Sequence, residues 1–401
     1  MAVTETTTIS WGSRLGSSIK GVLVGLGLFV VGFPVLFWNE GNTVKTRKAL
    51  DEGQGACVVV ESNAKVDNDL DGKLVHMTGL ADTKDVLVDG AFGIQATAIK
   101  LVRKVEMYQW VEESHTKDEK KLGGKVERTT TYTYKKDWCS GVVSSANFKE
   151  AGHENPSTIE FQDESKLAQN VTFGAFRLSE SQIASIDRSQ PYAFPTNYVC
   201  PAGRTVLNGN VLYVPNAETR TNPKNERDVV AMPRIGDMRV TITQILPHKI
   251  SLVAKQNGDT FGAYIAKNGK RVQLLVDGEK SMEEMFASAQ SANTMMCWIV
   301  RFVGILLMYM GLSMVFRPLS VLADVLPILG DIVGIGTGLV AGLIAGICGL
   351  TTIAIAWIVY RPVLGVILLA AAGGLVFLLM KKRAAKKAAA TAAPAPAAQN
   401  A

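Results

Sequence analysis

Long apolar runs near both ends of the chain flank a polar middle in which apolar and polar positions alternate. A run of about 18 or more apolar residues predicts a helix that crosses the hydrocarbon core of a membrane. The sequence therefore predicts four transmembrane helices, at residues 21–38, 298–316, 332–359 and 363–380. A cleaved signal peptide is the alternative for the first run, but no small-residue cleavage site follows Trp38.

Residues 39–297 are expected to form one large domain between the first two helices. Period-two alternation of β-branched and aromatic residues predicts strands at Ala56–Val60, Lys73–Thr78, Ala98–Trp110, Arg128–Trp138, Arg239–Ile245, Ile250–Ala254 and Phe261–Ile265. The polar stretch Ser114–Lys125, which contains Gly123 and Gly124, predicts that the third and fourth of these strands form a hairpin. The predicted fold class is an α+β membrane protein with four transmembrane helices and a large β-rich extracytoplasmic domain.

Helices are expected at both connections between this domain and the membrane. Thr43–Glu52 contains good helix formers, stops at Gly53 and continues the first span outward. Ser281 and Glu284 have the spacing of a capping box and open a helix over Met282–Asn293 that leads into the second span. A second capping box, Ser179 with Gln182, predicts a helix inside the domain.

Basic residues beside the apolar runs assign the orientation. The net charge is +6, and the membrane-anchoring basic set is Arg14, Lys20, Arg317, Lys381, Lys382, Arg383, Lys386 and Lys387. Such residues favour the cytoplasmic face, so residues 1–20, the loop 317–331 and the disordered Ala/Pro-rich tail 381–401 are expected in the cytoplasm. Arg361 alone opposes this orientation.

The orientation also fixes the expected compartment and partners. The domain would face the periplasm across a bacterial inner membrane, or the lumen of the endoplasmic reticulum or nuclear membrane in a eukaryote. Membrane lipids are expected partners of the basic set. Nucleic acid is not, because no basic helix or basic–aromatic module occurs elsewhere.

Three ionisable residues lie close to the predicted spans. Arg301 is less than one turn inside the second span, where its side chain is expected to reach the interface. Arg317 and Pro318 are expected to end that helix. Asp324 and Asp331 flank an apolar stretch of the next loop and are interpreted as solvated charges, with cation or proton binding as the alternative.

Glycines recur every four residues in the third span, at Gly334, Gly338, Gly342 and Gly346, and Gly21 and Gly25 repeat the spacing in the first. Glycines at this spacing share one helix face and let another backbone approach closely. They are therefore expected to be helix-packing residues, either within one chain or between two copies.

The sequence gives little support for a catalytic or cofactor site. None of the five cysteines lies in a C-x-x-C pair, and one bridge among Cys57, Cys139 and Cys200 is left open without a choice of partners. The four histidines lack metal-ligand spacing. Gly336, Gly338 and Ala341 match a dinucleotide fingerprint only formally, inside an apolar span with no preceding strand. We expect no cofactor, no metal and no enzymatic activity.

Several strings, taken together, resemble the transmembrane protein 43 family, also called LUMA. Their order and spacing agree from about residue 20 to 380. The strings are Asn39-Glu40-Gly41, Gly72–His76, Val105–Glu112, Asn147-Phe148, Gly152-His153, Asn155-Pro156, Gly236–Val240 and Tyr360-Arg361-Pro362. The Ala/Pro-rich, Ala-rich ending suggests a bacterial member.

The resemblance implies four spans with a large extracytoplasmic domain, and a membrane-organising role. Eukaryotic relatives reside in the endoplasmic reticulum and inner nuclear membrane, where they bind membrane and lamina proteins and self-associate. The expected function is a non-enzymatic membrane scaffold that forms a homo-oligomer and binds other membrane proteins. A channel or transport component built from the four helices is the alternative, and a membrane enzyme with a hidden polar cleft is a third.

Overall fold

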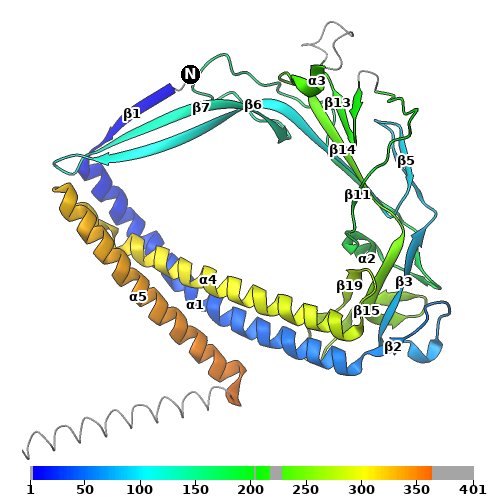
Figure 1. Cartoon of the computed structure of the whole chain (residues 1–401). Helices are drawn as coiled ribbons and strands as arrows, with labels where there is room; N and C mark the ends of the chain where they lie inside the picture. Colours follow the sequence, from blue (N-terminus) through cyan, green and yellow to red (C-terminus); the bar gives the residue numbers. More distant parts are fainter. Residues whose placement is uncertain (1–2, 203–204, 217–227, 364–401) are drawn as a thin grey trace, which may run out of the picture. The chain divides into compact units, whose positions relative to one another are not determined.

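The computed structural model describes residues 3–202, 205–216 and 228–363, which divide into two compact units (Figure 1). Unit 1 contains the N-terminal residues to Trp11 and Arg47–Ala292. Unit 2 contains Gly12–Thr46 and the residues from Asn293 onward. Helices and sheets are both present, which confirms the predicted α+β class and the large β-rich region.

The described part of unit 2 is built from three long helices. They are α1 (Trp11–Ala56), α4 (Met282–Ala323) and α5 (Pro327–Tyr360), and α1 and α4 also contribute residues to unit 1. All three are long and apolar enough to cross a membrane, and they contain the first three predicted spans. The fourth predicted span, the basic cluster from Lys381 to Lys387 and the predicted tail lie outside the described residues.

The prediction that the second helix ends at Arg317-Pro318 is wrong. Helix α4 continues through Pro318 to Ala323, and α1 likewise contains Pro34. Proline removes one backbone hydrogen bond, which membrane helices tolerate because neighbouring groups satisfy the freed carbonyl. The connection to α5 is therefore short, and Pro327 begins that helix, where its missing N–H costs nothing.

Helices α1 and α4 come into backbone contact at two glycines. A Cβ placed on Gly25 would lie 2.5 Å from the carbonyl oxygen of Gly311, and a Cβ on Gly311 would lie 2.5 Å from that of Gly25. Gly304 faces Leu36 in the same seam. The two backbones therefore touch where only glycine fits.

The four glycines of α5 lie beside the face that packs in the bundle. The buried face of α5 carries Ala341, Ala345, Gly349, Thr352, Ile353 and Ala356. A Cβ on Gly338 would lie 3.7 Å from the Tyr309 hydroxyl, one on Gly342 3.8 Å from the Tyr309 ring, and one on Gly334 3.2 Å from the Ser320 hydroxyl, whereas nothing described lies within 4 Å of Gly346. Any close backbone approach at this glycine face therefore belongs to a partner outside the described residues, and the expectation stays a prediction.

Unit 1 contains two main sheets. The eight-stranded sheet has the order β1-β7-β6-β14-β13-β12, with β11 on β14 and β8 on β6. Its strands are β1 (Val3–Ile9), β6 (Lys100–Lys120), β7 (Val126–Ser140), β8 (Glu164–Leu167), β11 (Gln190–Pro191), β12 (Val206–Asn208), β13 (Val211–Val214) and β14 (Met238–Ile245).

The seven-stranded sheet has the order β19-β15-β16-β10-β9-β3-β2, and β15 also pairs with β3. Its strands are β2 (Val58–Val60), β3 (Leu74–Thr83), β9 (Val171–Phe173), β10 (Phe176–Arg177), β15 (His248–Asn257), β16 (Thr260–Gly262) and β19 (Leu274–Asp277). Smaller elements complete the unit: β4 (Val86–Asp89), β5 (Ile94–Thr97), β17 (Tyr264–Ile265), β18 (Arg271–Val272), the 3-10 turn Asn68–Leu70, α2 (Glu180–Ser185) and α3 (Asp228–Ala231).

The ends of the two long helices are part of the core of unit 1. Ala49 and Leu50 of α1 pack with Met285 and Phe286 of α4 against the seven-stranded sheet. Both capping boxes are confirmed, since Ser281 and Glu284 exchange hydrogen bonds of 3.2 Å, and Ser179 and Gln182 form the same arrangement. The helical connections predicted at both ends of the domain are therefore present.

The predicted hairpin is confirmed, but its strands are longer than expected. Strands β6 and β7 pair from Glu106–Ser140 to Lys120–Val126. Most of the polar stretch Ser114–Lys125 is therefore paired strand and not loop. Alternating charges and threonines let both faces of this ribbon contact water, so the strands continue where the apolar alternation has ended.

The N-terminal strand β1 adds to the outer edge of β7. The predicted topology puts residues 1–20 and the domain on opposite sides of the membrane, whereas this ladder requires both in one compartment. A chain with α1 inserted across a bilayer in that orientation cannot keep the β1–β7 ladder. The outer edge of β7 is then open.

We predict that Gly25→Leu and Gly311→Leu each destabilise the helix pair by about 1–3 kcal/mol, because the added side chain has no room. Gly27→Leu, in the same helix but with nothing within 4 Å, is the matched control. Thermal unfolding of the purified full chain in detergent checks this. Equal midpoints for the Gly25 and Gly27 variants would show that the backbones do not touch.

Candidate functional site

A buried ion pair joins α1 to α4 in unit 2. The Glu40 side chain is fully buried and that of Arg301 is 10% exposed. Arg301 Nε donates to Glu40 Oε1 at 2.5 Å and its Nη2 donates to Oε2 at 2.9 Å. Two parallel charge-assisted bonds are the strongest arrangement that an arginine and a carboxylate form.

Helix α5 contributes a third member to this cluster. Trp357 Nε1 donates to Glu40 Oε2 at 2.8 Å, and the guanidinium lies 4.7 Å from the Trp298 ring and 5.6 Å from the Trp357 ring. The Cys297 thiol lies 3.8 Å from Glu40 Oε1. The carboxylate is thus occupied by donors from two helices, and the cluster joins three helices instead of presenting a free charge.

The side chain of Arg301 does not extend outward along the helix surface as expected, because it turns into the bundle to meet Glu40. A carboxylate beyond the end of the first apolar run carries no local sign of a partner 261 residues away. The only sequence signal was Arg301 itself, a charge inside a span, for which a partner is the default expectation.

Two of the strings that carry the family resemblance meet next to this cluster. Gly41 faces Tyr360, and a Cβ on Gly41 would lie 2.5 Å from the ring carbon that bears the hydroxyl. The Phe37 and Tyr360 rings lie 5.3 Å apart. Asn39-Glu40-Gly41 and Tyr360-Arg361-Pro362 therefore belong to one packing site.

A second ion pair joins the opposite ends of α1 and α4. Arg14 binds Asp324, whose side chain is 1% exposed. Asp324 also leaves no room for a side chain at Gly330. The interpretation of Asp324 as a solvated charge is therefore wrong, whereas Asp331 is exposed. Arg14, expected to anchor the chain to lipid, holds two helices together here.

The two pairs are spaced to suit a bilayer. The 26-residue step from Arg14 to Glu40 rises about 39 Å at about 1.5 Å per residue. Lys20 is the first exposed basic residue after Arg14. The 20 residues from Lys20 to Glu40 rise about 30 Å, which is the thickness of the hydrocarbon core. A hydrocarbon core that began at Lys20 would end beside Glu40 and Arg301, next to Trp38 and Trp298, which are 65% and 63% exposed, as in an interfacial aromatic belt.

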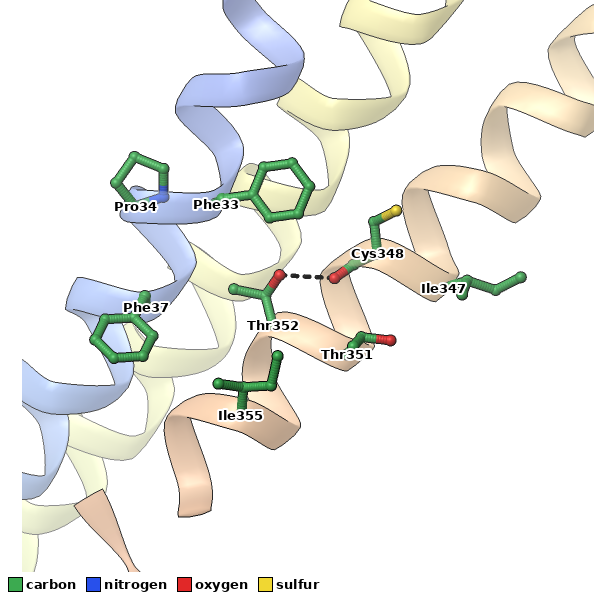
Figure 2. A pocket seen from close by; sticks show the side chains of 8 residues that line it. All are labelled: Phe33, Pro34, Phe37, Ile347, Cys348, Thr351, Thr352 and Ile355. Atoms are coloured by element: carbon green, nitrogen blue, oxygen red, sulfur yellow. Dashed lines mark hydrogen bonds between the residues drawn. The ribbon is translucent and has the colours of Figure 1, made fainter. Parts of the chain in front are cut away.

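An apolar groove of about 470 Å³ lies between α1 and α5. Figure 2 shows Phe33 and Phe37 on α1 facing Cys348 and Thr352 on α5. The Thr352 hydroxyl turns back to the carbonyl oxygen of Cys348 at 2.7 Å. This wall therefore suits an acyl chain or an apolar side chain better than a polar substrate.

In unit 1, other family strings come together around β6. Arg239 Nε donates to Glu106 Oε2 at 2.6 Å. Asn155 binds both backbone groups of Trp110, accepting from its N–H at 2.8 Å and donating to its carbonyl oxygen at 2.9 Å. His153 packs on Trp110, with ring centres 4.4 Å apart. These strings align strands and a loop, which is a structural task.

The titratable groups in the described part of unit 1 are dispersed. The histidines at 76, 153 and 248 bond or stack with different neighbours. All five cysteines are free, so the bridge left open by the sequence is not formed. Burial and the Glu283 carboxylate raise the pKa of the Cys57 thiol to about 12, which disfavours a nucleophilic thiolate. Among the described residues, no group of three His, Cys, Asp or Glu side chains could hold a metal.

Comparison with known proteins identifies relatives along most of the chain. The family model described as Transmembrane protein 43 matches residues 107–362. Transmembrane protein 43 of Rattus norvegicus is 34% identical, with 88% of each chain covered, and that of Homo sapiens is 32% identical with the same coverage. The homolog of Drosophila melanogaster is 32% identical, with 86% of this chain and 90% of the relative covered.

No solved structure matches the chain. The resemblance drawn from the quoted strings is confirmed. The relatives named here are animal proteins and lend no support to the expected bacterial origin.

We predict that Glu40→Gln destabilises unit 2 by about 3–5 kcal/mol, because Arg301 is left as an uncompensated buried charge. Glu40→Gln combined with Arg301→Gln is expected to recover most of that loss, since two neutral amides can bond to each other and to Trp357. Unfolding midpoints in detergent for both single variants and the double variant measure the coupling.

The matched control is the exposed pair Lys249–Glu279, whose side chains are 64% and 61% exposed. Glu279→Gln is expected to change stability by less than about 1 kcal/mol. Additive effects of the two substitutions at Glu40 and Arg301 would contradict the buried pair.

Proposed function

The chain belongs to the transmembrane protein 43 family, and on that premise we propose that it is a non-enzymatic integral membrane scaffold. It self-associates and holds other membrane proteins in complexes. The observation that carries the proposal is the closed cluster of Glu40, Arg301 and Trp357, which uses its buried charges to join helices.

Two further features support a scaffold. Helices α1 and α4 are unbroken, and their outer ends are part of the core of unit 1. Unit 1 is also large, about 250 residues, and its polar strings align strands instead of converging on a cleft. Such a body offers extended surface for partner proteins.

The proposed location is a multi-pass position in a membrane, with both termini in the cytoplasm and the β-rich domain on the other side. That side is the periplasm for an inner membrane and the lumen for the endoplasmic reticulum or nuclear membrane. The basic set flanking the helices supports this orientation. Lipids are proposed partners of the apolar helix faces and of the groove at Phe33 and Thr352.

A channel or transport component is the second candidate, because ionisable residues buried among membrane helices often mark ion pathways. The pairs Arg14–Asp324 and Glu40–Arg301 are such residues. Each pair is neutral and its carboxylate already binds an arginine. A passing cation would therefore have to displace a side chain that belongs to the same protein. The scaffold therefore ranks first.

We predict that crosslinking and native mass measurement in the source membrane find homo-oligomers of the full chain together with other membrane proteins. Purified chain in proteoliposomes is expected to give ion flux at the background level, as is the Asp324→Asn variant. Monomers alone would refute self-association. Flux above background that Asp324→Asn abolishes would favour the transport candidate.

A further inference from the structure

Strand β1, which covers the outer edge of β7, has a sequence that copies β7. Val3–Ile9 is VTETTTI, and Val126–Tyr132 is VERTTTY. Both strings begin with valine, carry three threonines at their fourth to sixth positions and end with a large apolar or aromatic residue.

The register of the β1–β7 ladder adds a second coincidence. The strands run antiparallel, with Val3 opposite Tyr132, Thr6 opposite Thr129 and Ile9 opposite Val126. If each β1 residue is replaced by the β7 residue at the same place in its string, Thr129 lies opposite Thr129 and Val126 opposite Tyr132. This is the ladder of two β7 strands related by a two-fold axis through Thr129.

We propose that the outer edge of β7 is the docking surface for β7 of a second copy of this chain, and that β1 occupies the place of that second strand. The inference rests on the proposed self-association and names its surface. It also resolves the topological conflict, because α1 inserted across the bilayer carries β1 away and leaves the edge open.

An open edge strand of this kind pairs readily. Its backbone N–H and C=O groups lack partners, and the segment contains no proline or bulge that would block a neighbour. In the two-fold ladder Glu127 lies opposite Thr131 and Arg128 opposite Thr130, so no like charges face each other directly. Arg128 keeps its own Asp118 on β6, with two bonds of 2.7 and 2.8 Å.

One contact distinguishes the two states. Glu5 of β1 binds Lys149 Nζ at 3.0 Å and accepts from the Tyr132 hydroxyl at 3.3 Å. In the two-fold ladder, Arg128 of the second copy takes the place of Glu5. Its charge is already neutralised by Asp118, but the bond to Lys149 is lost, so β1 competes with the second copy when both are in one compartment.

The test is disulfide formation between copies of the full chain carrying Thr129→Cys in membranes. Directly opposed residues of antiparallel strands have Cα atoms about 4.5–5.5 Å apart, within disulfide reach. Thr133→Cys, on the same strand and equally half-buried, is the control, because its two copies would lie more than about 20 Å apart. The chain with only its native cysteines gives the background.

Mild oxidation is expected to crosslink Thr129→Cys into dimers at least about tenfold more than Thr133→Cys, because only the former holds the two thiols together. Deleting residues 3–9 is expected to leave this yield unchanged or to raise it. An intramolecular disulfide in a Thr6→Cys/Thr129→Cys variant in the membrane, without dimer, would overturn the proposal, since β1 would then hold the edge.

Native mass measurement on the unmodified chain separates this failure from that of the proposed function. Oligomers without the Thr129→Cys crosslink would overturn the β7 interface and leave self-association standing. Monomers alone would overturn both.

Discussion

A charge taken out of water into an apolar bundle needs an opposite charge with good geometry, and that constraint organises unit 2. Glu40 and Arg301 satisfy each other, and Trp357 satisfies the remaining acceptor position. The cluster therefore fixes which residue of α1 faces which residue of α4 and α5. Moving either helix by one turn would separate the charges at a cost of several kcal/mol.

The rest of the α1–α4 pair keeps the same antiparallel register. From Asn39 and Cys297 the contacts run antiparallel through Gly25 and Gly311 to Arg14 and Asp324. Glycines stand where the backbones touch, and the ion pairs stand at the two ends. Both segments run from basic to acidic along the chain, from Arg14 to Glu40 in α1 and from Arg301 in α4 to Asp324 directly after it. An antiparallel arrangement in one register is the only one that neutralises both ends, which suits a fixed structural part better than a moving one.

Much of this architecture is visible in the sequence because it depends on local pattern. Apolar run length gives the helices of unit 2, alternation gives β3, β6, β7, β14 and β15, and spacing gives the capping boxes at Ser179 and Ser281. The resemblance gives the family from strings such as Asn39-Glu40-Gly41. The structural role of those strings is not visible in the sequence, because Gly41 and Tyr360, which pack together, are more than 300 residues apart along the chain.

The predictions that were wrong also failed because they depended on contacts between residues far apart in the sequence. Arg301 and Asp324 were each interpreted from their own surroundings, as an interfacial and a solvated charge, whereas their partners Glu40 and Arg14 lie far away in sequence. Pro318 was expected to stop a helix, since the local cost of proline was counted without the neighbours that relieve it in a bundle. Strand β1 was missed because a short threonine-rich segment has no core-facing side.

The central claim, that the two ion pairs mark the two faces of the membrane, is tested most directly by depth measurement along α1. Spin labels at Gly16→Cys, Val30→Cys and Lys45→Cys of the full chain in a bilayer report access to oxygen, which enriches in hydrocarbon, and to a polar nickel chelate. The account predicts the highest ratio of oxygen to nickel access at Val30, between Lys20 and Glu40, and low ratios at Gly16 and Lys45. A ratio at Val30 no higher than at the two ends would contradict it.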